Sequence, residues 1–202
     1  MDRIKLKELA KTQISGNIGI IFLMYLIIYL IVTVLSVIPV VGPVLGTIAG
    51  FVFSMQMVIV FLGLTRGENP EVSNLFDIFK NQRLCENSIL MYLLMTFFIT
   101  LWSLLFVVPG IIKSLSYAMA PYIMAENEYF MSPSDAIKES MRIMQGHKME
   151  LFTIYLSFIG WILLSILTCG LLFIYVEPYM QATIANFYNE IKDKPQEPVI
   201  TE

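Results

Sequence analysis

The stretch that decides the fold is Val107–Glu128, VVPGIIKSLSYAMAPYIMAENE. Pro109 and Gly110 interrupt this apolar run near its start, and acidic residues that include Glu126 end it in a segment expected to lie in water. Proline lacks a backbone donor and glycine tolerates tight turns. The pattern therefore predicts a turn at Pro109-Gly110 and a descending membrane helix over residues 111–125. Variants of this unit recur in the rest of the chain.

The composition is typical of a membrane protein. The 202 residues are 57% hydrophobic and 14% charged, with a mean hydropathy of +0.72. Soluble domains average about 45–50% apolar and about 25% charged residues. Because so much apolar surface is unfavourable in water, lipid is the expected solvent. The net charge of −3 comes with no basic stripe, so we expect no nucleic-acid partner.

Six apolar segments approach the length that crosses a hydrocarbon core of about 30 Å at about 1.5 Å per residue. They are residues 18–38, 44–64, 88–108, 111–125, 151–167 and 171–188. The first is too long for a signal peptide and is expected to be retained. The predicted fold is all-α: a polytopic membrane helix bundle with six transmembrane helices. We expect one domain over residues 1–190 and a disordered cytoplasmic tail over 191–202.

Three polar stretches are expected to form short amphipathic helices on the cytoplasmic side. The first, residues 1–16, either lies on the anionic leaflet or begins the first membrane helix. The second is predicted to start at Asn69-Pro70, and the third at a Ser132-Pro133 cap, ending at Gly146. Their predicted inner faces are Leu6, Leu9, Ala10 and Ile14; Val72, Leu75, Phe76 and Phe79; and Ile137, Ser140, Met141 and Met144.

The order of short helix, membrane helix, turn and membrane helix recurs three times. The predicted turn glycines are Gly42, Gly110 and Gly170, which are 68 and 60 residues apart. Because each unit contains an even number of spans, we predict three parallel hairpin repeats, at about 1–65, 66–128 and 129–190. The alternative, that any chain of hairpins with glycine turns shows this pattern, stays open.

The basic residues predict the orientation. Twelve of the 13 lysines and arginines lie before the first span, after the last, or in loops on the same side, and Lys113 is the exception. The positive-inside rule then places both termini in the cytoplasm. On this topology Cys85 and Cys169 lie on opposite faces of the membrane, so no disulfide is expected.

Glu177 is an acid inside an apolar segment, about 10 Å from the predicted turn at Gly170. A charge at that depth is costly and is expected to have a partner. Lys113 is the basic residue nearest that side, so we predict an ion pair between Glu177 and Lys113. In the alternative, Lys113 reaches the outer head groups and Glu177 is protonated or hydrated.

Prolines and tyrosines cluster around the same segments. Pro121 and Pro178 free backbone carbonyls one turn earlier, and such breaks line ligand cavities or serve as packing kinks. Tyr117, Tyr122 and Tyr179 offer hydroxyls to a buried polar group, or anchor and pack the helices. These five residues are therefore candidates for a cavity or a kink.

Catalytic and metal signatures are weak in this sequence. His147 is the one histidine, the serines lack a partnered base, and no cysteine pair has metal-ligand spacing. We therefore expect no enzyme activity, no metal and no cofactor.

Four stretches carry a resemblance to a known family: LKELAKTQISGNIG (6–19), GENPEVSNLFDIFK (67–80), PGIIKSLSYAMAPYIMAEN (109–127) and PSDAIKESMRIMQGHK (133–148). With them the chain resembles a bacterial integral-membrane family, domain of unknown function 975. It is more distantly similar to the membrane domain attached to some glycerophosphodiester phosphodiesterases. The resemblance implies a compact multi-helix protein of the cytoplasmic membrane and carries over no catalytic residue.

The expected function is that of a non-enzymatic integral membrane protein of the bacterial cell membrane. Its expected partners are membrane lipids: it binds a lipid or lipid-linked ligand, or else another membrane protein. The alternative is a small transporter or export factor, including one that protects against membrane-active peptides. A third class, a lipid-directed membrane enzyme, rests only on the phosphodiesterase resemblance. The sequence leaves the oligomeric state open.

Overall fold

The computed structural model describes residues 3–127, 131–168 and 170–192, and this part of the chain folds into helices without a strand. The elements are α1 (Arg3–Ile14), α2 (Ile18–Ser36), α3 (Gly42–Thr65), the 3₁₀ helix η1 (Val72–Lys80), α4 (Gln82–Leu105), α5 (Val107–Tyr117), α6 (Ala120–Glu126), α7 (Pro133–Ile143), α8 (Lys148–Leu167) and α9 (Phe173–Lys192). The predicted all-α class is confirmed. Most of the predicted tail, and Cys169, lie outside the described residues, and Cys85 is a half-buried free thiol.

Four helices are long and apolar enough to cross a membrane. They are Ile18–Ser36, Gly42–Thr65, Gln82–Leu104 and Lys148–Leu167. The predicted span at 111–125 is instead divided between α5 and α6, which have 11 and 7 residues. The predicted span at 171–188 corresponds to α9, which is 20 residues long but carries several polar side chains. These four helices are compatible with membrane insertion.

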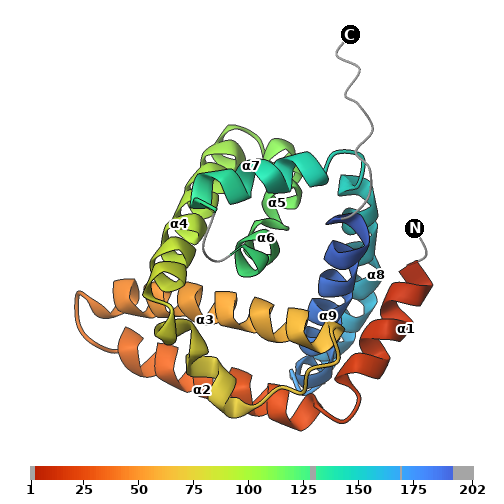
Figure 1. The fold of residues 1–202 in the computed structure, drawn as a ribbon, viewed down its shortest axis with the longest axis horizontal. Coiled ribbons are helices and arrows are strands. Elements are labelled where there is room, and N and C mark those ends of the chain that lie inside the picture. The colour runs from red at the N-terminus through yellow and green to blue at the C-terminus, as the bar shows by residue number, and fades with distance from the viewer. Residues whose placement is uncertain (1–2, 128–130, 169, 193–202) are drawn as a thin grey trace.

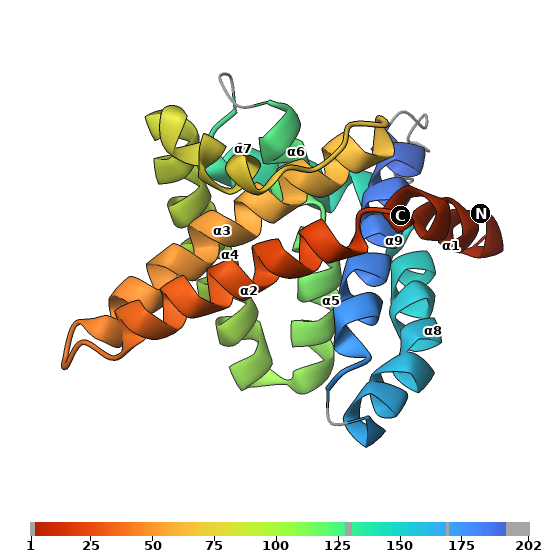
Figure 2. The same ribbon diagram turned by 90° about the horizontal axis from the view of Figure 1, so that it is seen from below.

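Three helical hairpins, α2–α3, α4–α5 and α8–α9, give the molecule its shape (Figure 1). Figure 2 shows their turns in the lower half of the view, with η1, α6 and α7 on the opposite side. α3 and α9 contact each other, and each buries more than half of its residues. α2 buries only Ile21 and Met24. It therefore presents large apolar side chains outward, as a lipid-facing helix does.

The turn between α4 and α5 lies three residues earlier than predicted. Phe106 has the extended backbone that reverses the chain, and Pro109 and Gly110 fall in the first turn of α5. Proline is tolerated there because the first backbone donors of a helix have no intrahelical partner. Gly110 permits close packing of the hairpin, since a Cβ at this position would lie 2.2 Å from the Ser103 hydroxyl.

The predicted continuous helix over 111–125 is wrong, because the chain breaks between Tyr117 and Ala120. Pro121 has no backbone N–H to continue the ladder. Ser140 of α7 bridges the break: its hydroxyl donates to the Ser116 carbonyl at 2.8 Å and accepts from the Met119 N–H at 3.2 Å. The break is therefore stabilised by a buried side chain from a neighbouring helix.

The first short helix packs against the bundle. α1 contacts α9 and buries Leu6, Ala10 and Ile14, but Leu9, predicted on the same face, is exposed. The Lys7 ammonium lies 4.2 Å from the centre of the Phe158 ring. Burial, and then the charge of Arg3, lowers the pKa of Lys7.

Of the other two short helices, α7 begins as predicted and η1 does not. Ser132 caps α7 and accepts from the Asp135 N–H at 3.2 Å, as predicted. The second helix is a 3₁₀ helix capped by Glu71 and Asn74, so the predicted start at Asn69-Pro70 is wrong. Of its predicted inner face, Leu75 is buried and Phe76 and Phe79 are exposed.

Candidate functional site

A cavity of about 450 Å³ lies where the three hairpins meet, lined by residues of α2, α3, α4, α5, α6, α8 and α9. Its walls are largely apolar. Its principal polar side chains are Tyr25, Tyr92, Tyr122, Tyr155, Glu177 and Gln181. An apolar cavity of a few hundred cubic ångströms with a few convergent polar groups is typical of a ligand site.

The polar groups of this cavity have few partners within the protein. Glu177 Oε1 accepts one hydrogen bond, at 2.9 Å, from Gln181 Nε2 one turn along α9. Among the described residues, the hydroxyls of the four lining tyrosines have no hydrogen-bond partner in the protein. These oxygens are not among the fully buried unpartnered atoms, so they are accessible and have hydrogen-bonding capacity to offer a bound molecule.

The cavity has a negative electrostatic character. Glu177 is the charged residue in its described lining, which contains no lysine, arginine or histidine. Lys113 lies elsewhere: its ammonium is 5.2 Å from the centre of the Trp102 ring and 6.0 Å from that of Tyr117. The structure thus gives Glu177 and Lys113 different neighbours and forms no ion pair between them in the described part of the chain.

The structure places the other predicted site residues in two groups. Pro121 and Tyr122 line the cavity. Tyr117 packs near Phe98, and Tyr179 contacts the Phe158 ring edge to face, with centroids 5.1 Å apart.

Pro178 is buried inside α9, next to Glu177 in the chain. Of the predicted turn glycines, Gly42 is the first residue of α3. Gly170 lies in the turn before α9 with a φ of +87°.

Sequence reasoning missed three tyrosines of this cavity, one from the first long helix of each hairpin. Tyr25, Tyr92 and Tyr155 precede Gly42, Gly110 and Gly170 by 17, 18 and 15 residues. That regular offset was the available signal. It is inconspicuous because single tyrosines in membrane helices more often pack or anchor.

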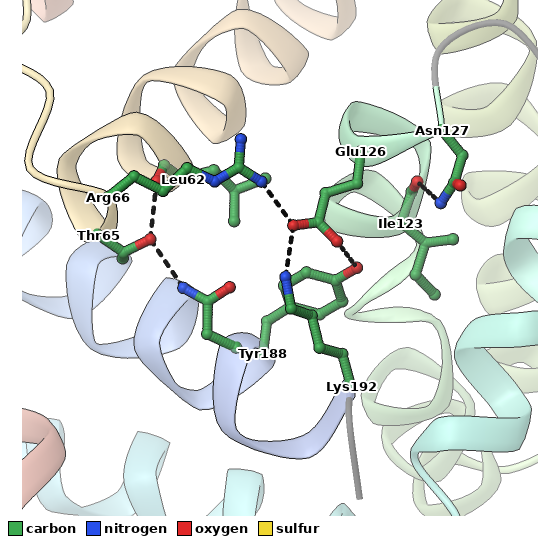
Figure 3. A network of polar contacts seen from close by, with 9 residues as sticks. Leu62, Thr65, Arg66, Ile123, Glu126, Asn127, Tyr188 and Lys192 are labelled. Carbon is green, nitrogen blue, oxygen red and sulfur yellow. Dashed lines mark hydrogen bonds and ion pairs between the residues drawn. The ribbon is translucent and has the colours of Figure 1, made fainter.

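A second polar cluster joins three helix ends (Figure 3). Glu126, the last residue of α6, accepts from Arg66 Nη2 and Lys192 Nζ, both at 2.6 Å, and from the Tyr188 hydroxyl at 2.8 Å. Arg66 follows α3, and Tyr188 and Lys192 belong to α9. We call these four residues the Glu126 network. Glu126 was expected to lie in water, but its side chain is only 18% exposed.

The pKa of Glu126 reflects two opposing influences. Burial alone would raise it, but the hydrogen bonds from Lys192, Tyr188 and Arg66 and the charge of Lys192 together hold it below its ordinary value. The carboxylate is therefore ionised at neutral pH. It links the network to the cavity, because the Tyr188 ring stacks on Tyr122 with centroids 5.4 Å apart.

Comparison with known proteins identifies a family. The model of the family described as "Protein of unknown function (DUF975)" matches residues 1–113 and 106–195. No curated protein and no solved structure gives a significant match, and the similarity to phosphodiesterase membrane domains is not shown. Since the two matched ranges together cover nearly the whole sequence, the chain belongs to the DUF975 family.

Proposed function

We propose that this protein is a non-enzymatic integral membrane protein that binds a lipid or lipid-linked amphiphile in the cavity around Glu177. The observation that carries the proposal is a carboxylate that lines the same cavity as four tyrosines whose hydroxyls have no partner among the described residues. Polar groups left unsatisfied among apolar helices are unfavourable, so a bound polar head group would stabilise them.

The charge of the cavity favours a ligand with a cationic head group. The Glu177 carboxylate attracts a positive charge, and the described lining supplies no basic side chain to hold an anion. A tyrosine ring whose face meets the cation would add cation–π attraction, worth about 2 kcal/mol when the cation is desolvated. We therefore infer an ammonium-bearing amphiphile rather than an anionic one.

The apolar part of the lining matches the hydrocarbon part of the proposed ligand. Ile28, Phe53, Met57 and Met180 line the same cavity and offer flexible or aromatic contacts to a hydrocarbon segment. A molecule with a charged amine and an apolar tail thus matches both kinds of surface.

The proposal includes the membrane topology. We propose that α5 and α6 together form the fourth span and that α9 forms the sixth, in three parallel hairpin repeats. In support, a short helix precedes each hairpin: α1 before α2–α3, η1 before α4–α5 and α7 before α8–α9. The distribution of 12 of 13 basic residues supports cytoplasmic termini in the bacterial cell membrane.

A second candidate function is transport. The break between α5 and α6 and the proline inside α9 both lie next to the cavity, and discontinuous helices at a central site are typical of transporters. In vesicles containing the protein, transport predicts uptake of the same cation along an imposed gradient. A binding protein predicts saturable binding without flux.

The test uses two amphiphiles with equal chains and opposite charge. Dodecyltrimethylammonium and dodecyl sulfate are titrated into the protein in lipid nanodiscs by calorimetry, with empty nanodiscs subtracted. We expect saturable binding of the cation at least about tenfold tighter than the anion, a difference of about 1.4 kcal/mol. Glu177→Gln should remove that preference, and the exposed control Glu8→Gln should keep it. Equal affinity for both amphiphiles would contradict the proposal.

A further inference from the structure

A separate cavity of about 270 Å³ lies between α3, the connecting residues 66–71 and η1. It shares no described lining residue with the cavity around Glu177. One wall is a single face of α3, on which Gln56 and Gly63 lie two turns apart. The opposite wall comes from η1 and the polar segment before it.

Gln56 supplies the strongest indication of a ligand. Gln56 lines this cavity but is only 2% exposed, and its Oε1 has no hydrogen-bond partner among the described residues. Burying an amide oxygen without a donor is unfavourable, and native proteins rarely leave one in that state. The α3 wall of the cavity therefore carries an acceptor that a ligand N–H group would satisfy.

Two carboxylates stand in the same lining. Glu68 lies against α3 where Gly63 leaves room for it, since a Cβ at Gly63 would be 2.6 Å from Glu68 Oε2. Asp77 is positioned by Asn74 Nδ2 at 3.0 Å and Lys80 Nζ at 2.6 Å. Those two hydrogen bonds lower the pKa of Asp77, which keeps it ionised at neutral pH. The described lining contains no basic residue, and because Lys80 pairs with Asp77 from outside it, Glu68 supplies the negative charge that has no counter-charge among the described residues.

The free oxygens suit an organic cation better than a metal ion. The amide oxygens of Asn74 and Asn81 already accept from the Glu71 and Leu84 backbone N–H groups, at 2.7 and 3.1 Å. Among the described residues no group of three or more His, Cys, Asp or Glu side chains is placed to hold a metal. Calcium takes six to eight oxygens, more than the cavity has left, and the Mg²⁺ titration below tests the hydrated metal directly.

We propose that this cavity binds a small water-soluble cation with several N–H donors, an amine or guanidinium compound. Gln56 Oε1 accepts from the ligand at the α3 wall, and Glu68 and Asp77 hold the positive charge. Charge-assisted hydrogen bonds to carboxylates are about twice as strong as neutral ones, and they give the site its preference for a cation. The site is independent of the amphiphile proposed for the cavity around Glu177.

The experiment titrates agmatine, which carries a guanidinium and an amine, into the full chain in nanodiscs by calorimetry. Urea serves as the neutral probe and Mg²⁺ as the metal. We expect agmatine to bind and urea and Mg²⁺ not to compete. Glu68→Gln and Gln56→Met should each weaken agmatine binding at least about tenfold.

The control is Glu86→Gln, which removes an exposed carboxylate of α4 outside the cavity lining and should change agmatine affinity by less than about twofold. Without ligand, Gln56→Met should raise the thermal midpoint of unfolding, because it removes the unpartnered oxygen. A raised midpoint would show that the variant is folded and that its loss of binding comes from the site. Absence of agmatine binding to the wild-type protein, binding that survives both site variants, or displacement by Mg²⁺ would each overturn the proposal.

Discussion

Glu126 and Glu177 are both partly buried carboxylates, yet the protein holds them in opposite ways. Glu126 receives three short hydrogen bonds from Arg66, Lys192 and Tyr188 at the ends of the helices. Glu177 receives one, from Gln181, and faces a cavity. A carboxylate that accepts several hydrogen bonds from neighbouring helices fixes the positions of those helices. A carboxylate that accepts few hydrogen bonds from the protein can still accept them from a ligand.

The largest effect on stability is expected at Glu126. Glu126→Gln replaces two acceptor oxygens by one and leaves Lys192 and Arg66 without their counter-charge, which should cost about 2 kcal/mol of unfolding free energy. Thermal unfolding in mild detergent measures the loss. The control Glu139→Gln removes an exposed pair with Arg142 on α7 and should cost less than about 0.5 kcal/mol. Equal losses in the two variants would contradict a special role for the Glu126 network.

The hydrogen bonds that Glu126 accepts also predict that the stability of the protein depends on pH. The pKa of Glu126 is lower in the folded than in the unfolded chain, so its contribution is fully present above its ordinary value of 4.5. It is lost as the pH falls below that value through the folded pKa, because the unfolded state then binds the proton more readily. Unfolding midpoints measured from pH 7 downward should show this component in the wild-type protein. Glu126→Gln should lack it; a parallel decline in both proteins would argue against the assignment.

An intermediate effect is expected at the break between α5 and α6. Ser140→Ala leaves the Ser116 carbonyl and the Met119 N–H without their buried partner, which should cost about 1–2 kcal/mol. Ser165→Ala is the matched control, since the Ser165 hydroxyl is also buried but donates to the Trp161 carbonyl within its own helix. It should cost clearly less in the same unfolding assay. A Ser140→Ala protein as stable as wild type would mean that the break needs no bridge.

A smaller effect is expected at Lys113. Lys113→Met removes the cation over Trp102 and Tyr117 but keeps an apolar stem, at a cost of about 0.5 kcal/mol. A double-mutant cycle with Glu177→Gln checks the predicted ion pair. The structure predicts additive effects, since the two residues have different neighbours. A coupling energy of about 1 kcal/mol or more would show that they interact.

The sequence predicted the helical class, the apolar hairpins and the Ser132 cap, because these follow from local composition and spacing. It did not predict the break after Tyr117. Pro121 signals a kink, but the partner that stabilises it, Ser140, lies 24 residues from Ser116 in the chain. The position of the α4–α5 turn was missed for a related reason: proline and glycine fit the first turn of α5 as well as they fit a loop.

The candidate site was predicted only in part, for the same physical reason. Glu177, Pro121 and Tyr122 stand out along the chain because of their chemistry, and they do line one cavity. Tyr25 and Tyr155 join them through the packing of separate hairpins, and their regular offset from the turn glycines was the only sequence signal for it. The partners of Glu126, which are Arg66 after α3 and Tyr188 and Lys192 of α9, also come from distant segments.

The central claim is that Glu177 selects a cationic amphiphile, and mass spectrometry of the protein extracted in native lipid nanodiscs tests it most directly. Glu177→Gln is nearly isosteric and should change the unfolding free energy by less than about 0.5 kcal/mol, the smallest effect among these variants. We expect an amine-bearing lipid or lipid-linked molecule to be retained by the wild-type protein and lost from the folded variant. The same complement of bound molecules in both proteins would contradict the account.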